Sequence, residues 1–173
     1  MTRATDTVQK AVTFNPKNQS VFRFATDELF NSAVQTLDEY DMQEEIQLMK
    51  MLGDPEATLC NCLWFLMEKR KWNYPEQFNE KTELHKNYHG KIKNNTCNNM
   101  KTNTLMTICV GLQQTFRIVE KLFEKSNNKL DYYNDPDMTF IHILERFPCI
   151  SLIEFNDMLE IKNIPRLETK SRD

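Results

Sequence analysis

The fold is decided by residues 103–126, which read NTLMTICVGLQQTFRIVEKLFEKS. Apolar side chains recur in this stretch every three or four positions, at Leu105, Ile108, Cys109, Leu112, Phe116, Val119 and Phe123. That spacing places them on one face of an α-helix. We therefore predict a single amphipathic helix over 103–126 at the centre of the fold, with Phe116 in the core.

Two further helices are predicted on the C-terminal side of this stretch. Asp135 and Pro136 open a short helix, which Pro148 closes because proline removes a backbone donor and restricts the residue before it. Ser151 with Glu154 has the spacing of a capping box, in which each side chain bonds the backbone of the other residue. The last helix is therefore expected to start there.

Helices are also predicted on the N-terminal side. A first helix runs from about Thr26 to Tyr40, or on through Met49, with acidic residues in its first turn. At residues 53–55 the sequence Gly-Asp-Pro predicts that glycine ends one helix, aspartate caps the next and proline takes its first position. Another helix is expected over 75–90, from a proline to a glycine.

The spacing and the composition together predict an all-α protein. Only three glycines occur in 173 residues, fewer than hairpin-connected sheets usually need, and the length suits one domain. We expect a single compact helical bundle of about six helices over 21–164. A flexible N-terminal arm at 1–20 precedes it, a loop or hinge at 91–103 interrupts it, and a C-terminal tail at 165–173 follows it.

The cysteines and the N-terminal residues predict a reducing compartment. The five cysteines are an odd number without the spacing of a secreted disulfide scaffold, and no charged segment followed by an apolar stretch begins the sequence. No window approaches the roughly 18–20 apolar residues that span a bilayer. We expect reduced thiols and a cytoplasmic or nuclear location. The glycosylation patterns Asn18-Gln19-Ser20 and Asn94-Asn95-Thr96 are then expected to be unused.

One group of residues has the types that bind zinc. The candidate ligands are Cys60, Cys62, His85 and His89, with Cys97 as a further thiol. Two histidines four residues apart on a helix can point the same way, and zinc takes four thiolate or imidazole ligands in a tetrahedron. Two cysteines separated by one residue in a helix face different directions, however. We therefore expect buried cysteines and surface histidines rather than a metal site.

The middle of the chain is its basic part. Residues 59–104 carry eight basic and four acidic groups, net +4, whereas the whole chain is −3. Basic side chains at Lys69, Arg70 and Lys71 are followed by aromatic ones at Trp72 and Tyr74, with further lysines up to residue 93. A nucleic-acid surface would combine cations with stacking rings in this way. The alternative is that the lysines stabilise a helix C-terminus while Trp72 closes the core beneath them.

No arrangement typical of catalysis appears in the sequence. A dyad of His142 and Cys149 would need a third group to orient it, and Cys149 lies in an apolar segment. The carboxylate pairs Asp38/Asp41 and Glu44/Glu45 are expected on the solvated side of the first helix. Because phosphate-binding glycine loops and other catalytic motifs are also lacking, we predict no enzymatic activity and no cofactor.

These observations favour a non-enzymatic, intracellular protein–protein interaction module, an adaptor or scaffold that holds a partner helix in an apolar groove. A bundle of this size around a central apolar helix is compatible with Bcl-2-like adaptors and with many other bundles, so it singles out no family. The alternatives are a helical protein that binds nucleic acid through 69–93 and a small zinc-binding domain.

Overall fold

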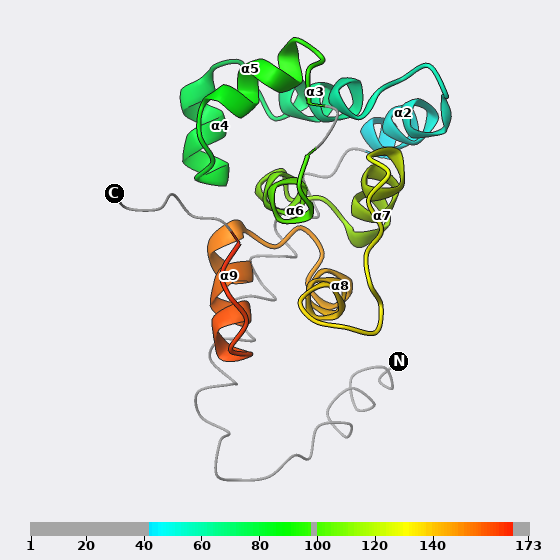
Figure 1. The fold of residues 1–173 in the computed structure, drawn as a ribbon. Coiled ribbons are helices and arrows are strands. Elements are labelled where there is room, and N and C mark those ends of the chain that lie inside the picture. The colour runs from blue at the N-terminus through cyan, green and yellow to red at the C-terminus, as the bar shows by residue number, and fades with distance from the viewer. Residues whose placement is uncertain (1–41, 98–99, 168–173) are drawn as a thin grey trace, which may run out of the picture.

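A computed structural model describes residues 42–97 and 100–167, and within these residues the protein is all-α, as predicted, with eight helices and no strand. They are α2 (Met42–Gly53), α3 (Leu59–Lys69), α4 (Pro75–Thr82), α5 (Asn87–Lys93), α6 (Thr102–Gly111), α7 (Phe116–Lys125), α8 (Asp137–Arg146) and α9 (Leu152–Ile161) (Figure 1). The predicted arm at 1–20 lies outside the described residues, and so does most of the predicted first helix. The alternative in which this helix continues through Met49 overlaps with α2.

Helix α6 is the centre of the fold. Every residue from Thr104 to Val110 is buried, so the helix is enclosed on all sides. It packs against α4, α7 and α9, while α3 pairs with α5 and α2 lies against α3 and α7 (Figure 1). The buried apolar side chains of all these helices form one continuous core cluster.

The prediction of one helix over 103–126 is wrong, because α6 ends at Gly111 and α7 begins at Phe116. Gln113 between them takes a positive φ of 54°, a conformation that stops a helix. A Cβ on Gly111 would lie 3.0 Å from the Lys81 carbonyl oxygen, so glycine allows α6 to approach α4 this closely. The apolar spacing continues across the break because both helices bury a stripe in the same core.

The predicted helix over 75–90 is also two helices. Pro75 does begin α4, but Glu83 takes a positive φ of 56° directly after Thr82. Gly90 lies inside α5, which extends to Lys93, so the loop expected from residue 91 starts later. Because two predicted helices each divide, the described residues form eight helices rather than about six.

The start of α3 also differs from the prediction. Gly53 ends α2 as expected, but Asp54 and Pro55 form a turn and Thr58 caps α3 instead. Thr58 Oγ1 accepts a hydrogen bond from the Asn61 backbone N–H, and the Thr58 backbone N–H donates to Asn61 Oδ1. The cap of α3 is therefore a capping box at Thr58, four residues after Asp54, the cap expected from the sequence.

The C-terminal helices confirm the local signals. Ser151 and Glu154 form the predicted capping box of α9, and α8 ends at Arg146, two residues before Pro148. Within the expected tail at 165–173, Leu167 is 1% exposed and its N–H donates to Asn156 Oδ1. The chain as far as Leu167 therefore packs against α9.

Candidate functional site

A pocket of about 390 Å³ lies beside the C-terminal half of α7, under the loop that leads to α8. Phe123 and Leu130 contribute apolar side chains, and the other lining residues are polar: Glu120, Glu124, Asn127, Asn128, Lys129 and Tyr132. Its size falls within the range of about 300–1,000 Å³ typical of ligand pockets. We name it the acidic–aromatic pocket.

Tyr132 at this pocket lies among carboxylates. Its hydroxyl donates a short hydrogen bond to Glu120, and this bond is the main cause that raises the pKa of Tyr132 to about 12. Partial burial and the charges of Glu120, Glu145 and Glu124 add to the increase. Glu124 is paired with Lys121 at 2.7 Å, and Lys129 adds a positive charge to the pocket lining, whereas Glu120 and Glu145 are in no ion pair within the described residues.

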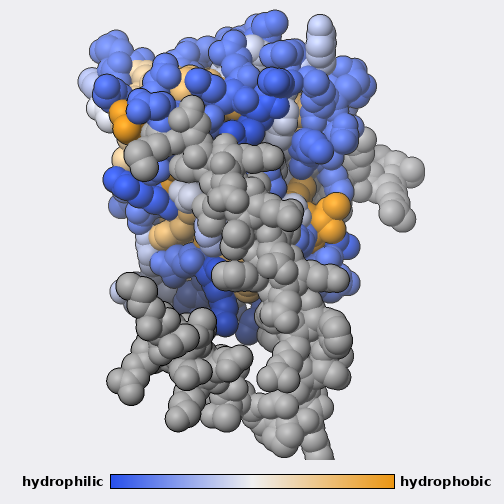
Figure 2. All heavy atoms as spheres, turned by 180° about the vertical axis from the view of Figure 1, so that it is seen from behind, coloured by the Kyte–Doolittle hydropathy of each residue, from blue (hydrophilic) through white to orange (hydrophobic). Residues whose placement is uncertain are grey.

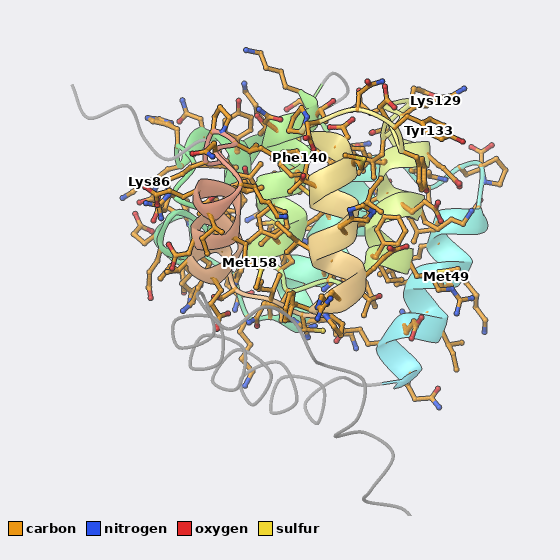
Figure 3. All side chains as sticks on the ribbon, turned by 90° about the horizontal axis from the view of Figure 1, so that it is seen from below. Met49, Lys86, Lys129, Tyr133, Phe140 and Met158 are labelled. Atoms are coloured by element: carbon orange, nitrogen blue, oxygen red, sulfur yellow. A yellow bond between two sulfur atoms is a disulfide. The ribbon has the colours of Figure 1, made fainter. Side chains whose placement is uncertain are left out.

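The loop beside the pocket holds a second tyrosine in solvent. Asp131 fixes the turn by accepting hydrogen bonds from the Tyr133 N–H and the Asn134 side chain. Tyr133 is 87% exposed, and it projects with Lys129 from one edge of the molecule (Figure 3). Sequence reasoning missed this site. The local signal that could have indicated it is the pair of adjacent tyrosines, Tyr132 and Tyr133, in an otherwise polar turn.

An aromatic contact connects the pocket to the start of α7. The rings of Phe116 and Tyr132 meet edge to face with centroids 6.5 Å apart. Phe116 is only partly buried, contrary to the prediction that it lies in the core. Phe116 thus contacts Tyr132, the ring that lines the pocket together with Glu120, Glu124 and Lys129.

The basic segment predicted from the sequence does not form one surface. Trp72 is 6% exposed and packs edge to face against Phe78, which is the core-closing position weighed as the alternative. Arg70 pairs with Glu44, while Tyr74 and Lys71 are exposed. Trp72 in the core and Arg70 in its ion pair are therefore not available to a nucleic acid.

Three lysines on α3 and α5 lie over aromatic rings. Lys93 lies over the Trp64 ring at 5.6 Å, Lys91 over Tyr88 at 5.2 Å, and Lys69 over Phe65 at 5.4 Å. We name these six residues the α3–α5 lysine face. Its lysines belong to the basic segment predicted from the sequence, but its three rings were not predicted. The spacing of Tyr88 with Lys91 and of Phe65 with Lys69, three and four residues apart on a helix, could have indicated two of these contacts.

The candidate zinc ligands are not brought together. Cys60 forms a disulfide with Cys97, their Cα atoms 6.2 Å apart, so the expectation of reduced thiols is wrong for this pair. Burial raises the pKa of the Cys62 thiol, which disfavours the thiolate that zinc binds. His89 is buried and its Nε2–H donates to the Trp72 carbonyl oxygen, whereas His85 is exposed. The described residues contain no group of three or more candidate metal ligands.

The residues weighed for catalysis are also explained by packing. Cys149 is buried, and desolvation raises the pKa of its thiol, while His142 is exposed on α8. Glu44 is not on a solvated face as predicted, because it is buried with Oε1 3.3 Å from Arg70 Nη1. Glu45 is partly buried, and Asp38 and Asp41 lie outside the described residues.

Comparison with protein-family models, with curated proteins and with solved structures finds no match. None of the helices in the described part of the chain is long and apolar enough to cross a membrane. Within the described residues the chain is an all-α protein with an acidic–aromatic surface pocket.

Proposed function

We propose that this protein is a non-enzymatic interaction module, an adaptor or scaffold that binds a basic segment of a partner protein at the acidic–aromatic pocket. The observation that carries the proposal is the position of Tyr132, an aromatic ring surrounded by carboxylates at the edge of a pocket. A lysine or arginine side chain would find a ring for a cation–π contact and carboxylates for ion pairs in one place.

The partner surface differs from the apolar groove expected at first. In the coloured part of the face shown in Figure 2, most of the surface is hydrophilic and the apolar residues form small separate patches. The pocket has an apolar floor from Phe123 and Leu130 but a charged rim. Such a site fits the apolar stem and the charged end of a long basic side chain better than the apolar face of a helix.

Exposed tyrosines support a protein partner over a small ion. Tyrosine is enriched among the residues that contribute most to protein interfaces, because a rigid ring loses little entropy on binding. Tyr132 and Tyr133 are both exposed, and the Asp131 turn fixes the backbone that carries them. A preformed loop lowers the ordering cost of binding.

The test is selection of peptides from a random displayed library against the full chain. Peptides rich in lysine or arginine should be enriched, and their affinity should fall with salt. Glu120→Gln and Glu145→Gln should each weaken binding roughly fivefold, the upper range for exposed ion pairs. Glu80→Gln on α4 is the matched control and should leave affinity unchanged. Enrichment of uncharged peptides, or equal binding by the Glu120→Gln/Glu145→Gln variant, would refute the proposal.

A second candidate function is polyanion binding at the α3–α5 lysine face. It keeps the alternative of nucleic-acid binding through 69–93 but uses different aromatic residues. Three lysines lie over three rings there, and none of the three is in an ion pair within the described residues. Each phosphate contact would release a counterion, so affinity should fall steeply with salt. Lys91→Glu with Lys93→Glu should abolish binding to single-stranded probes, whereas Lys162→Glu on the other side of the fold should not. Binding that ignores salt would contradict this candidate.

A further inference from the structure

We propose that Asn94 is an N-linked glycosylation site, and that the protein acquires this glycan together with the Cys60–Cys97 disulfide in an oxidising secretory compartment. The sequence motif Asn94-Asn95-Thr96 has the required pattern of asparagine, any residue except proline, and threonine. The motif was expected to be unused because the sequence begins without a charged segment followed by an apolar stretch and because reduced cysteines were expected. The Cys60–Cys97 disulfide removes the second of these reasons.

The backbone presents Asn94 at a fixed surface position. Asn94 follows the last residue of α5, and Asn95 takes the left-handed conformation with φ 55°. The N–H groups of Asn95 and Thr96 donate to the carbonyl oxygens of Ile92 and Lys91 at 3.1 and 2.8 Å. This pair of bonds ends the helix as a Schellman motif, with asparagine in the place that glycine usually takes.

The Asn94 side chain itself is directed to solvent. It is exposed, and no hydrogen bond within the described residues occupies its amide. The neighbouring polar groups are engaged: Asn95 Oδ1 accepts from Thr58 Oγ1 at 2.6 Å, and Thr96 Oγ1 donates to the Lys91 carbonyl oxygen. A glycan on Asn94 would therefore extend into water without breaking any of these contacts.

The disulfide is the independent observation that points to the same compartment. Cys97 lies three residues after Asn94 and joins the turn to Cys60 at the start of α3, 37 residues away. Its N–H also donates to Cys60 Sγ. Structural disulfides persist mainly in oxidising compartments, and N-linked glycans are added to secreted proteins. The turn after α5 thus contains both the glycosylation motif and a disulfide cysteine.

Both reactions need a partner of known chemical class. The donor for Asn94 is an oligosaccharide linked to a lipid pyrophosphate. The Asn94 side-chain nitrogen bonds the anomeric carbon of the first sugar and releases one proton to a base. The carbon–oxygen bond to the pyrophosphate breaks, and the lipid pyrophosphate leaves with the electron pair. For the cysteines, a disulfide-bonded oxidoreductase takes two electrons and two protons, so its disulfide becomes two thiols as Cys60–Cys97 forms.

The site has a consequence for the α3–α5 lysine face. Lys93, which covers Trp64, is the residue directly before Asn94. A glycan at Asn94 would be attached beside this lysine and hinder the approach of a large polyanion. The acidic–aromatic pocket lies on α7 and the loop after it, so the proposed partner site is independent of this inference.

The test uses the full-length protein isolated from the cells that make it. Free thiols are alkylated before lysis, and a peptide N-glycosidase in heavy-oxygen water then converts glycosylated asparagine to labelled aspartate. Mass spectrometry should find the label at Asn94, and Cys97 should become alkylated only after reduction. An unlabelled Asn94, or a Cys97 alkylated without reduction, overturns the proposal.

Variants made in the same cells separate the site from its surroundings. Asn94→Gln and Thr96→Ala should each abolish the glycosidase-sensitive shift in electrophoretic mobility that this site produces. Asn95→Gln is the matched control, because it changes the adjacent asparagine and keeps the motif. A shift that survives Asn94→Gln but is lost in Asn18→Gln would assign the glycan to the other motif and overturn the assignment to Asn94.

Discussion

Phe116 and Phe123 lie seven residues apart on α7 and belong to one apolar stripe in the sequence, yet the fold buries them differently. Phe123 is 2% exposed, so Phe123→Ala leaves a cavity and should cost about 3–5 kcal/mol. Phe116 is partly buried against Tyr132. Solvent can fill the space that Phe116→Ala leaves, so only part of the transfer free energy is lost, about 1–2 kcal/mol. The sequence alone predicts the full core cost for Phe116.

Urea denaturation followed by circular dichroism measures both changes. With a slope of about 1–3 kcal/mol per molar urea, a difference of about 2 kcal/mol separates the two midpoints by roughly 1 M. Tyr133→Ala, which removes an exposed ring, is the control and should stay within about 0.5 kcal/mol of the parent. If Phe116→Ala costs as much as Phe123→Ala, the assignment of Phe116 to a partly buried position is wrong.

Three further outcomes are expected. Reduction of Cys60–Cys97, which closes a loop of 37 residues, should lower the free energy of unfolding by about 4 kcal/mol, and the same reductant should have no effect on a variant with both cysteines changed to alanine. Ultraviolet titration should find Tyr132 ionising at about pH 12, and Glu120→Gln should move that pKa down toward 10. Because the folded pKa is raised, stabilisation by this contact is complete below pH 10 and is lost as the pH rises through 12. Metal analysis should find no stoichiometric zinc, so one zinc per chain, lost in His89→Ala, would restore the metal-site hypothesis.

The sequence by itself determined the class of fold and several helix ends. Apolar spacing of three and four residues depends only on the period of the helix, so it indicated helices correctly. Ser151 with Glu154 and the proline at Pro75 act on backbone groups within one turn, and both start helices where predicted. These signals succeed because each depends on contacts between residues close in the sequence.

The tertiary structure decided the rest. Gln113 and Glu83 take positive φ values and interrupt helices that were predicted to be continuous, at the ends of α6 and α4, which pack against each other. Tertiary packing also places Glu44 in a buried position, where it pairs with Arg70 at the end of α3.

The acidic–aromatic pocket and the disulfide also depend on contacts between residues distant in the sequence. Tyr132 meets Glu120 because the loop after α7 folds back along that helix, and Cys97 meets Cys60 across 37 residues. No local pattern encodes such pairs. They form when the whole core packs, so helical class could be derived from neighbouring residues, whereas burial, charge pairing and the candidate site depended on residues distant in the chain.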